Sequence, residues 1–263
     1  MELQEYADRQ RSIAATLAAL IFRILWPFRR TRFTEKTWPT IEQAIYPAIE
    51  RSRRQSALVA REFYDSQRLQ HVGSRRDELL AGYKRSWLTE ALRPLKKDFL
   101  REGPKDVAIH KLVMASVKEV QNGGRRQILN AVRDEPRRIR WARVATGRET
   151  CAFCWMLISR GDVYLYADSA GLDSDRYTAE DLYRSKDFGK LDELMVRWHP
   201  DCDCLAVPVF DTGNWPGKDA ADRAYEVWKE ITKNKSGLDA LNALRRAIEN
   251  GEVDPEDFSA IAA

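Results

Sequence analysis

The sequence predicts an α+β protein in three parts. Apolar residues at helical spacing dominate residues 1–136, strand-like alternation surrounds a group of cysteines and a histidine in residues 137–211, and helical spacing returns in residues 212–263. Eight tryptophans and nine tyrosines among 263 residues argue against general disorder. We therefore expect a mainly helical N-terminal half, a small mixed α/β domain that carries the cysteines, and a helical C-terminal tail.

The helical half opens with an apolar run from Ile13 to Trp26, which is broken by Arg23. Its 14 residues fall short of the roughly 20 that a membrane-spanning helix needs. Acidic residues before the run, and no small-residue cleavage site after it, argue against a secretory signal. We expect an amphipathic helix that packs on this chain or on a partner, with no membrane contact; a helix on a membrane surface is the alternative.

Two apolar stripes predict the next helices, and a proline interrupts each of them. The first stripe surrounds Pro47, which we expect to kink or restart its helix. The second stripe contains Pro94 and ends before the clear break at Gly103-Pro104. The members of the two stripes are Ile41, Ile45, Ala48, Ile49, Leu80, Tyr83, Trp87, Leu88, Ala91, Leu95 and Phe99.

A third and longer stripe, from Val113 to Ala131, contains the pair Gly123-Gly124. A glycine weakens a helix by roughly 1 kcal/mol relative to alanine. We therefore expect a second backbone to pack closely against the helix at this pair. Pro136 ends the helical half.

Strand and helix signals alternate between Pro136 and Phe210. Thr178-Ala179-Glu180-Asp181 has the form of an N-cap box and predicts a helix that runs towards Trp198. Pro208 indicates that the final strand lies at an edge of its sheet. The other predicted elements are a strand at 138–143, a helical turn at 155–158, a strand at 163–166 and a strand at 204–210.

The C-terminal part begins with a linker at residues 213–217. Apolar residues at helical spacing then predict two helices, over residues 220–231 and 238–248. Gly251 ends the second helix, and Asp254-Pro255 predicts a short terminal turn.

Charge is distributed unevenly along the chain. The formal net charge is +4, yet residues 1–150 carry 31 Lys and Arg against 18 Asp and Glu, whereas residues 151–263 carry 13 against 22. The two halves therefore have net charges of +13 and −9. A basic half of this size favours contact with double-stranded DNA or with an acidic protein surface, and solvated helix faces are the alternative.

All four cysteines and one histidine lie in the middle part, in a spacing typical of a metal site. Zinc prefers four thiolate or imidazole ligands arranged as a tetrahedron. Cys202 and Cys204 stand at positions i and i+2, so in a strand both side chains project from one face. The preferred ligand set is Cys151, Cys154, His199 and one of Cys202 or Cys204, between which the sequence does not choose.

Disulfides and packed thiols are the alternatives to a metal ion. A chain without an export signal is expected in a reducing compartment, where clustered cysteines favour metal binding over disulfides. The 44 residues between Cys154 and His199 exceed a small zinc-finger loop. We therefore expect a structural zinc ion that stabilises a larger folded domain by closing this loop.

The same residues do not fit a catalytic metal site. A zinc deaminase requires H-x-E followed by P-C-x-x-C, whereas here the order is reversed and H-x-E is missing. A zinc hydrolase requires more histidines than the cluster offers, and a cysteine nucleophile would have only His199 as its base. We therefore expect that the protein is not an enzyme.

Four motifs in this region carry a family resemblance. They are Arg140-Trp141-Ala142-Arg143-Val144, Thr150-Cys151-Ala152-Phe153-Cys154, Ser159-Arg160-Gly161 before Val163-Tyr164, and His199-Pro200-Asp201-Cys202-Asp203-Cys204 before Val207-Pro208-Val209. With them, the stretch from about residue 138 to 209 resembles the phage Mu protein F-like (MuF-like) minor head protein domain. The resemblance is greatest to the versions in tailed phages of actinobacteria.

The resemblance implies a virion component that is made with the portal protein and the capsid, in multiple copies per virion. It would act in head morphogenesis and in DNA packaging or delivery, at the head interior or portal region, after assembly in the host cytoplasm. The family's metal or cross-link positions fall on Cys151, Cys154, His199, Cys202 and Cys204. A zinc-containing nucleic-acid-binding protein is the alternative, but the cysteine-bearing half is the acidic one.

Overall fold

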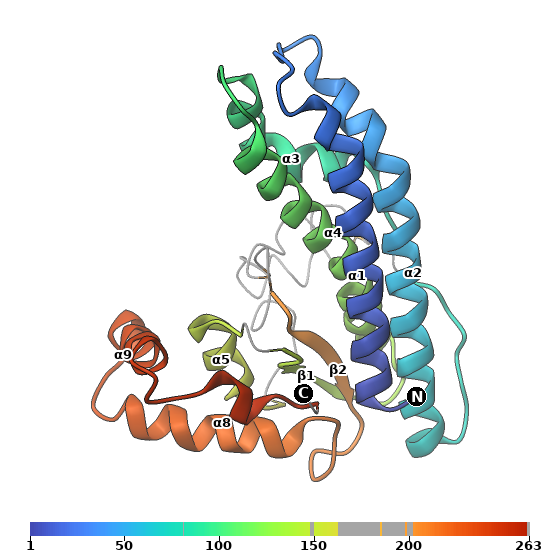
Figure 1. Ribbon diagram of the computed structural model, residues 1–263. Coiled ribbons are helices and arrows are strands. Elements are labelled where there is room, and N and C mark those ends of the chain that lie inside the picture. The colour runs from blue at the N-terminus through green and yellow to red at the C-terminus, as the bar shows by residue number, and fades with distance from the viewer. Residues whose placement is uncertain (81, 148–149, 163–184, 186–197, 199–201, 262–263) are drawn as a thin grey trace.

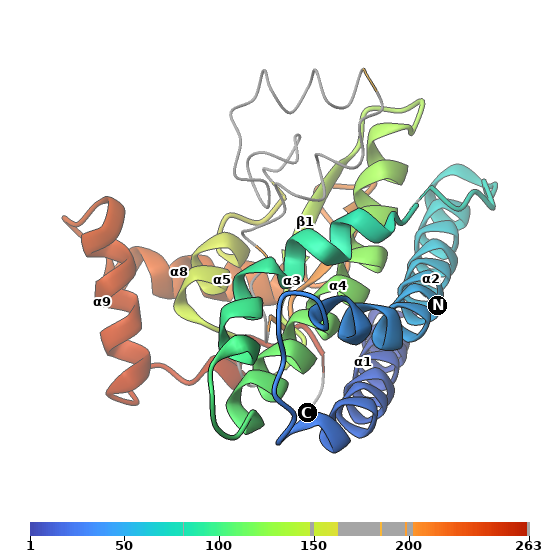
Figure 2. The same cartoon turned by 90° about the horizontal axis from the view of Figure 1, so that it is seen from above.

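The structure is a computed structural model that describes residues 1–80, 82–147, 150–162, 185, 198 and 202–261. Three long helices lie side by side, a two-stranded sheet lies near one end of them, and two further helices extend to one side (Figures 1 and 2). The predicted α+β class is confirmed. The helices of the N-terminal half are α1 (Leu3–Leu25), α2 (Trp38–Val72), α3 (Arg85–Leu100) and α4 (Asp106–Arg133), with a 3₁₀ turn η1 (Trp26–Phe28) after α1.

The sheet pairs two antiparallel strands that are far apart in the sequence, with Ala142 opposite Val207. The backbone N–H of Ala260 donates to the carbonyl oxygen of Ala145 at 3.0 Å, so the C-terminal tail returns to the sheet. Helix α5 packs on both helices of the C-terminal part. The elements are β1 (Arg140–Val144), α5 (Ala152–Ile158), β2 (Leu205–Val209), α8 (Lys218–Ile231), α9 (Gly237–Glu249) and the 3₁₀ turn η4 (Pro255–Phe258).

Helix α1 confirms the predicted amphipathic helix and extends it towards the N-terminus. Leu17, Ile21 and Leu25 form a fully buried stripe that belongs to the core shared with α2 and α4. Among the described residues, the stretch Leu3–Phe28 has the length and apolar composition of a membrane-spanning segment. Only 17% of the apolar window is buried, so one stripe of the helix packs on this chain while most of its surface does not. The absence of membrane contact stays a prediction.

The expected restart of the helix at Pro47 is wrong, because the 35-residue helix α2 continues through it; a kink there stays a prediction. A proline inside a helix removes the hydrogen bond to the carbonyl four residues earlier. Here both Pro47 and Gln43 are exposed, so water can satisfy that carbonyl without breaking the helix. Pro94 likewise lies inside α3.

Other predictions for the middle and C-terminal parts have mixed outcomes. The two described strands, the helical turn, both C-terminal helices and the terminal turn are confirmed, within a few residues at each end. The predicted strand at 163–166, the N-cap box at 178–181 and most of the helix after it lie outside the described residues.

Two apolar clusters occupy opposite ends of the long helices. One contains residues from α1, α2, α3 and α4, together with Phe33 of the segment between α1 and α2. The other joins the opposite ends of α1, α2 and α4 to the sheet, α5 and the C-terminal helices. The predicted domain boundaries at residues 136 and 211 both fall in segments that connect helices or strands. The apolar cluster that contains the sheet includes residues on both sides of each boundary. The division into three domains stays a prediction.

A layer of buried polar groups separates the two clusters, and it surrounds the pair Gly123-Gly124. Gln10 of α1 donates to the carbonyl of Ser56 at 2.9 Å, and the Ser56 hydroxyl donates back to Gln10 at 2.7 Å. A Cβ placed on Gly123 would lie 2.5 Å from the carbonyl oxygen of Arg53 in α2. The prediction of close backbone packing at this pair is therefore confirmed.

A second buried network ties the end of α2 to the segment between α4 and β1. The Glu135 carboxylate accepts hydrogen bonds from the Tyr64 hydroxyl at 2.7 Å and from Arg68 Nε at 2.8 Å. Burial alone would raise the pKa of Glu135, but these two donors outweigh it and hold the pKa below the ordinary value of 4.5.

Because the pKa of Glu135 is depressed in the folded state, its stabilising contribution is complete above pH 4.5 and is lost as the pH falls through the folded value. Glu135→Gln should therefore lower the free energy of unfolding by about 1–3 kcal/mol at pH 7, and this deficit should shrink below pH 4.5. Urea titrations at several pH values would measure it. The control is Glu62→Gln, whose carboxylate is half-exposed and pairs with Arg9; a parallel pH response of the two variants would contradict the prediction.

Candidate metal centre

Three cysteine side chains converge in the core of the sheet unit. Cys154 lies in the first turn of α5, and Cys202 and Cys204 immediately precede β2. Their Sγ atoms all lie within 4.8 Å of one another, and those of Cys154 and Cys202 are 3.5 Å apart. All three side chains are buried, with exposed fractions of 1%, 2% and 0%. The cluster therefore joins two segments that are 48 positions apart.

The backbone on either side of the thiols is held by hydrogen bonds to Asp203. The Thr150 hydroxyl donates to both carboxylate oxygens of Asp203, at 3.0 and 3.1 Å. The Thr146 hydroxyl donates to the Asp203 carbonyl at 2.6 Å. Burial raises the pKa of the Asp203 carboxyl to about 6. The segment that ends at Cys151 is thus tied to the segment that carries Cys202 and Cys204.

Two buried arginines lie beside the cluster. Arg125 of α4 is 1% exposed and donates to the carbonyl oxygens of Cys202 at 2.8 Å and Cys204 at 3.0 Å. The guanidinium carbons of Arg125 and Arg143 lie 4.1 and 3.5 Å from the ring centroid of Trp198. Trp198 is fully buried. These cation–π contacts place two positive charges next to the thiols without exposing them to water.

The thiols interact with one another, and these interactions shift their pKa values in opposite directions. Hydrogen bonds from Cys154 and Cys204, followed by the charges of Arg125 and Arg143, hold the pKa of Cys202 well below its ordinary value. The pKa of Cys154 is raised, first by its interaction with the Cys151 thiol and then by Cys202 and Cys204. Cys202 is therefore a thiol of this cluster whose pKa is lowered, and the charges of Arg125 and Arg143 contribute to that shift.

The spacing of the sulfurs fits a tetrahedral metal. With metal–sulfur bonds of about 2.3 Å, neighbouring thiolates in a tetrahedral zinc site are about 3.8 Å apart. The observed separations of 3.5 Å and up to 4.8 Å bracket that value. A metal bound by several thiolates carries net negative charge, which the buried Arg125 and Arg143 would compensate. The described residues thus contain a buried cluster of three thiols that could hold a metal ion.

The five predicted ligand residues have different outcomes. Cys154, Cys202 and Cys204 come together, so the structure does not select one of the last two but uses both. Cys151 precedes α5, is half-buried and contacts the Cys154 thiol, but it lies outside the group of three whose sulfurs are all within 4.8 Å of one another. Its contact with Cys154 makes it a candidate for the fourth ligand. His199 lies outside the described residues. All four cysteines are thiols rather than disulfides in the structure.

Arg125 and Arg143 were not predicted as part of the site. One signal in the sequence could have identified Arg143, because it shares a strand face with the apolar Ile139 and Trp141. A charged residue on the buried face of a strand needs a partner inside the protein. Arg125 gave no such signal, because its role depends on how α4 packs against the segment before β2.

The fold and the site together define an α+β protein in which a long-helix array carries a small sheet unit closed around buried thiols. The chain belongs to the VG15 protein family, whose model matches residues 1–231. It is 38% identical over 274 residues to the Gene 15 protein of Mycobacterium phage D29, covering 95% of this chain and 100% of the relative. It is also 38% identical over 295 residues to the Gene 15 protein of Mycobacterium phage L5, covering 100% of both.

No solved structure matches the chain. The family and its relatives identify a bacteriophage protein, which is the coarser part of what the sequence motifs predicted. The resemblance to the MuF-like domain is not reflected in the matching family model and stays a prediction.

Proposed function

We propose that this chain is a minor structural protein of the phage head, associated with the portal, that acts in head assembly and in DNA packaging or delivery. Two things support the proposal: the chain is related over its whole length to proteins of two mycobacteriophages, and its cysteine and histidine motifs resemble the MuF-like minor head domain. Its place would be the virion, at the head interior or portal region, and the host cytoplasm during assembly.

The burial of the thiol cluster is the observation that favours a structural role over a catalytic one. Structural metal sites are filled by protein ligands, whereas catalytic sites keep a position open for water or substrate. The three sulfurs belong to side chains that are at most 2% exposed, and a fourth thiol contacts one of them. We propose that the cluster holds a structural zinc ion, because zinc favours tetrahedral thiolate sites. The protein would then not be an enzyme.

The proposed partners are the portal protein and the capsid, with several copies of this chain in each virion. Contact with double-stranded DNA is proposed for the basic half, whose net charge over residues 1–150 is +13. Such contacts would be made mainly with phosphates and would depend little on base sequence.

Fractionation of purified phage particles tests the proposed function. Quantitative mass spectrometry of separated heads and tails should find the chain in the head fraction, in several copies per particle. Co-expression with a tagged portal protein should recover a complex, and the tagged major tail protein serves as the control bait. Absence from mature heads together with no portal complex would overturn the proposal.

A further inference from the structure

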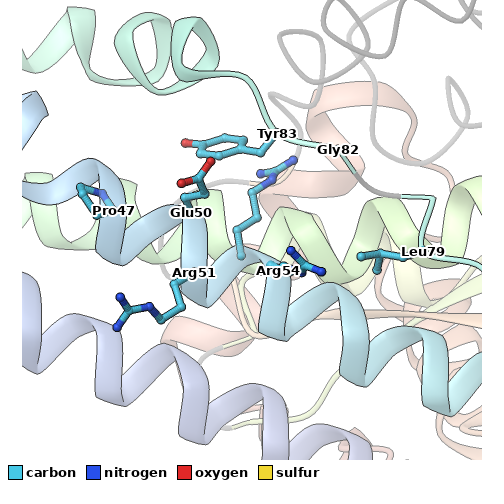
Figure 3. Close-up of a pocket in the computed structure, with 8 residues that line it drawn as sticks. Pro47, Glu50, Arg51, Arg54, Leu79, Gly82 and Tyr83 are labelled. Carbon is cyan, nitrogen blue, oxygen red and sulfur yellow. The ribbon is translucent and has the colours of Figure 1, made fainter.

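A groove on the helical half is lined by arginines and shares no lining residue with the thiol cluster. It has a volume of about 580 Å³. One wall is a face of α2, and the other is the segment that precedes α3, as Figure 3 shows. The residues that line it are Pro47, Glu50, Arg51, Arg53, Arg54, Leu79, Gly82 and Tyr83.

Two exposed arginines of α2, Arg51 and Arg54, are among the residues that line the groove. Arg51 and Arg54 are three residues apart, so their side chains are neighbours on one helix face. Within the described ranges, neither guanidinium forms an ion pair. The carboxylate that shares this wall, Glu50, accepts a hydrogen bond from the Tyr46 hydroxyl at 2.9 Å. The charge at the mouth of the groove is therefore positive.

Tyr83 of the opposite wall takes part in a stack of rings and guanidinium groups with residues of α2. Tyr46 and Tyr83 stack with centroids 5.9 Å apart and an interplanar angle of 9°. Arg85 lies 5.5 Å from the Tyr46 ring centroid, and Arg53 lies 4.6 Å from that of Tyr83. Arg53 is itself fixed by donating to the Glu119 carbonyl at 2.5 Å. A wall fixed in this way loses little conformational entropy when a ligand binds.

We propose that this groove binds the phosphodiester backbone of double-stranded DNA, with Arg51 and Arg54 contacting phosphates. Arginine suits phosphate because its planar guanidinium donates two parallel hydrogen bonds. Both arginines are exposed, so the groove can accept a long polymer that passes over it rather than only a small enclosed molecule. Lys84 and Arg85, also exposed at the start of α3, continue the positive surface beyond the groove.

This inference rests on the proposed contact with DNA, and the salt dependence of binding tests both. Anisotropy of a labelled duplex would be measured with the full-length protein between 50 and 200 mM salt. Each phosphate contact contributes about 0.9 to the slope of log affinity against log salt, so Arg51→Ala with Arg54→Ala should reduce that slope by about 2. Across this range the affinity of the double variant should fall about tenfold less than that of the unmodified protein.

The matched control is Arg245→Ala with Arg246→Ala, which removes the same charge from exposed positions of α9. Equal slopes for the two double variants, with both folded by circular dichroism, would overturn the inference but not the DNA contact. No salt-dependent binding by the unmodified protein would overturn both. Inorganic phosphate and polyglutamate, each at the same ionic strength, serve as competitors for the labelled duplex. Their potency is compared with that of unlabelled duplex per phosphate or carboxylate group. If either displaced the labelled duplex at a lower concentration of these groups than unlabelled duplex does, the groove would be assigned to another anion.

Discussion

Replacement of Cys202 by alanine should release the metal ion and unfold the sheet unit. Structural zinc supplies roughly 10–16 kcal/mol of apparent binding free energy in small domains, so the loss of one ligand should lower the free energy of unfolding by at least about 5 kcal/mol. Elemental mass spectrometry should find about one zinc per unmodified chain and only background zinc in the variant. Urea unfolding followed by tryptophan fluorescence would measure the stability.

Val207→Ala is the matched control for Cys202→Ala, because Val207 is fully buried in β2 and does not contact the metal in this proposal. It should cost about 2 kcal/mol and keep the full zinc content. Equal zinc content and equal stability in the two variants would show that the thiols are packed without a metal.

The fourth ligand can be identified by the same measurements. Cys151→Ser and His199→Ala each remove one candidate, and only the true ligand should lower the affinity for zinc by a large factor. Competition with a chromogenic chelator would compare the two variants. Because Cys151 contacts the Cys154 thiol, the larger loss is expected for Cys151→Ser.

Gly123→Ala should destabilise the protein by about 3 kcal/mol, at the upper end of the cost of overpacking. The added methyl would lie 2.5 Å from a carbonyl oxygen and 2.7 Å from a side-chain carbon of Arg53. Helices α2 and α4 would have to separate, and the hydrogen bonds of the surrounding polar layer would lengthen. This cost exceeds the roughly 1 kcal/mol that alanine gains over glycine inside a helix. Thermal unfolding would measure the difference.

Gly82→Ala provides the comparison, because a Cβ at Gly82 has nothing within 4 Å and its backbone is not in the left-handed region. It should be neutral or should stabilise the protein by up to about 1 kcal/mol, by restricting the unfolded chain. If both alanine variants unfolded at the same temperature as the unmodified protein, the close approach of α2 and α4 would be refuted.

The helices were predictable because each carries a stripe of apolar residues that a single packing direction can bury. The stripe around Leu17, Ile21 and Leu25 is one example, and the stripe on α4 is another. The glycine pair at 123–124 was also informative, since it makes sense only where a second backbone approaches. The effect of Pro47 was not predictable, because it depends on whether the carbonyl that loses its hydrogen bond faces solvent.

The cysteines of the thiol site were predictable from the sequence, but the arginine that contacts them was not. The spacing of Cys202 and Cys204 predicted that both side chains would point to one side, and the structure places both at the cluster. They lie in the segment before β2 and not in the strand itself. The contribution of Arg125 comes from 77 positions away and follows from the packing of α4. Spacing in a sequence reports local geometry, whereas such a contact depends on the path of the whole chain.

The length of α2 has a mechanical consequence. With 35 residues and a rise of about 1.5 Å per residue, it spans roughly 50 Å without interruption. Both apolar clusters and the polar layer brace it against α1 and α4, so it resists bending. Molecules bound at the two ends of α2 would be kept at a constant separation. The protein would then act as a spacer between them.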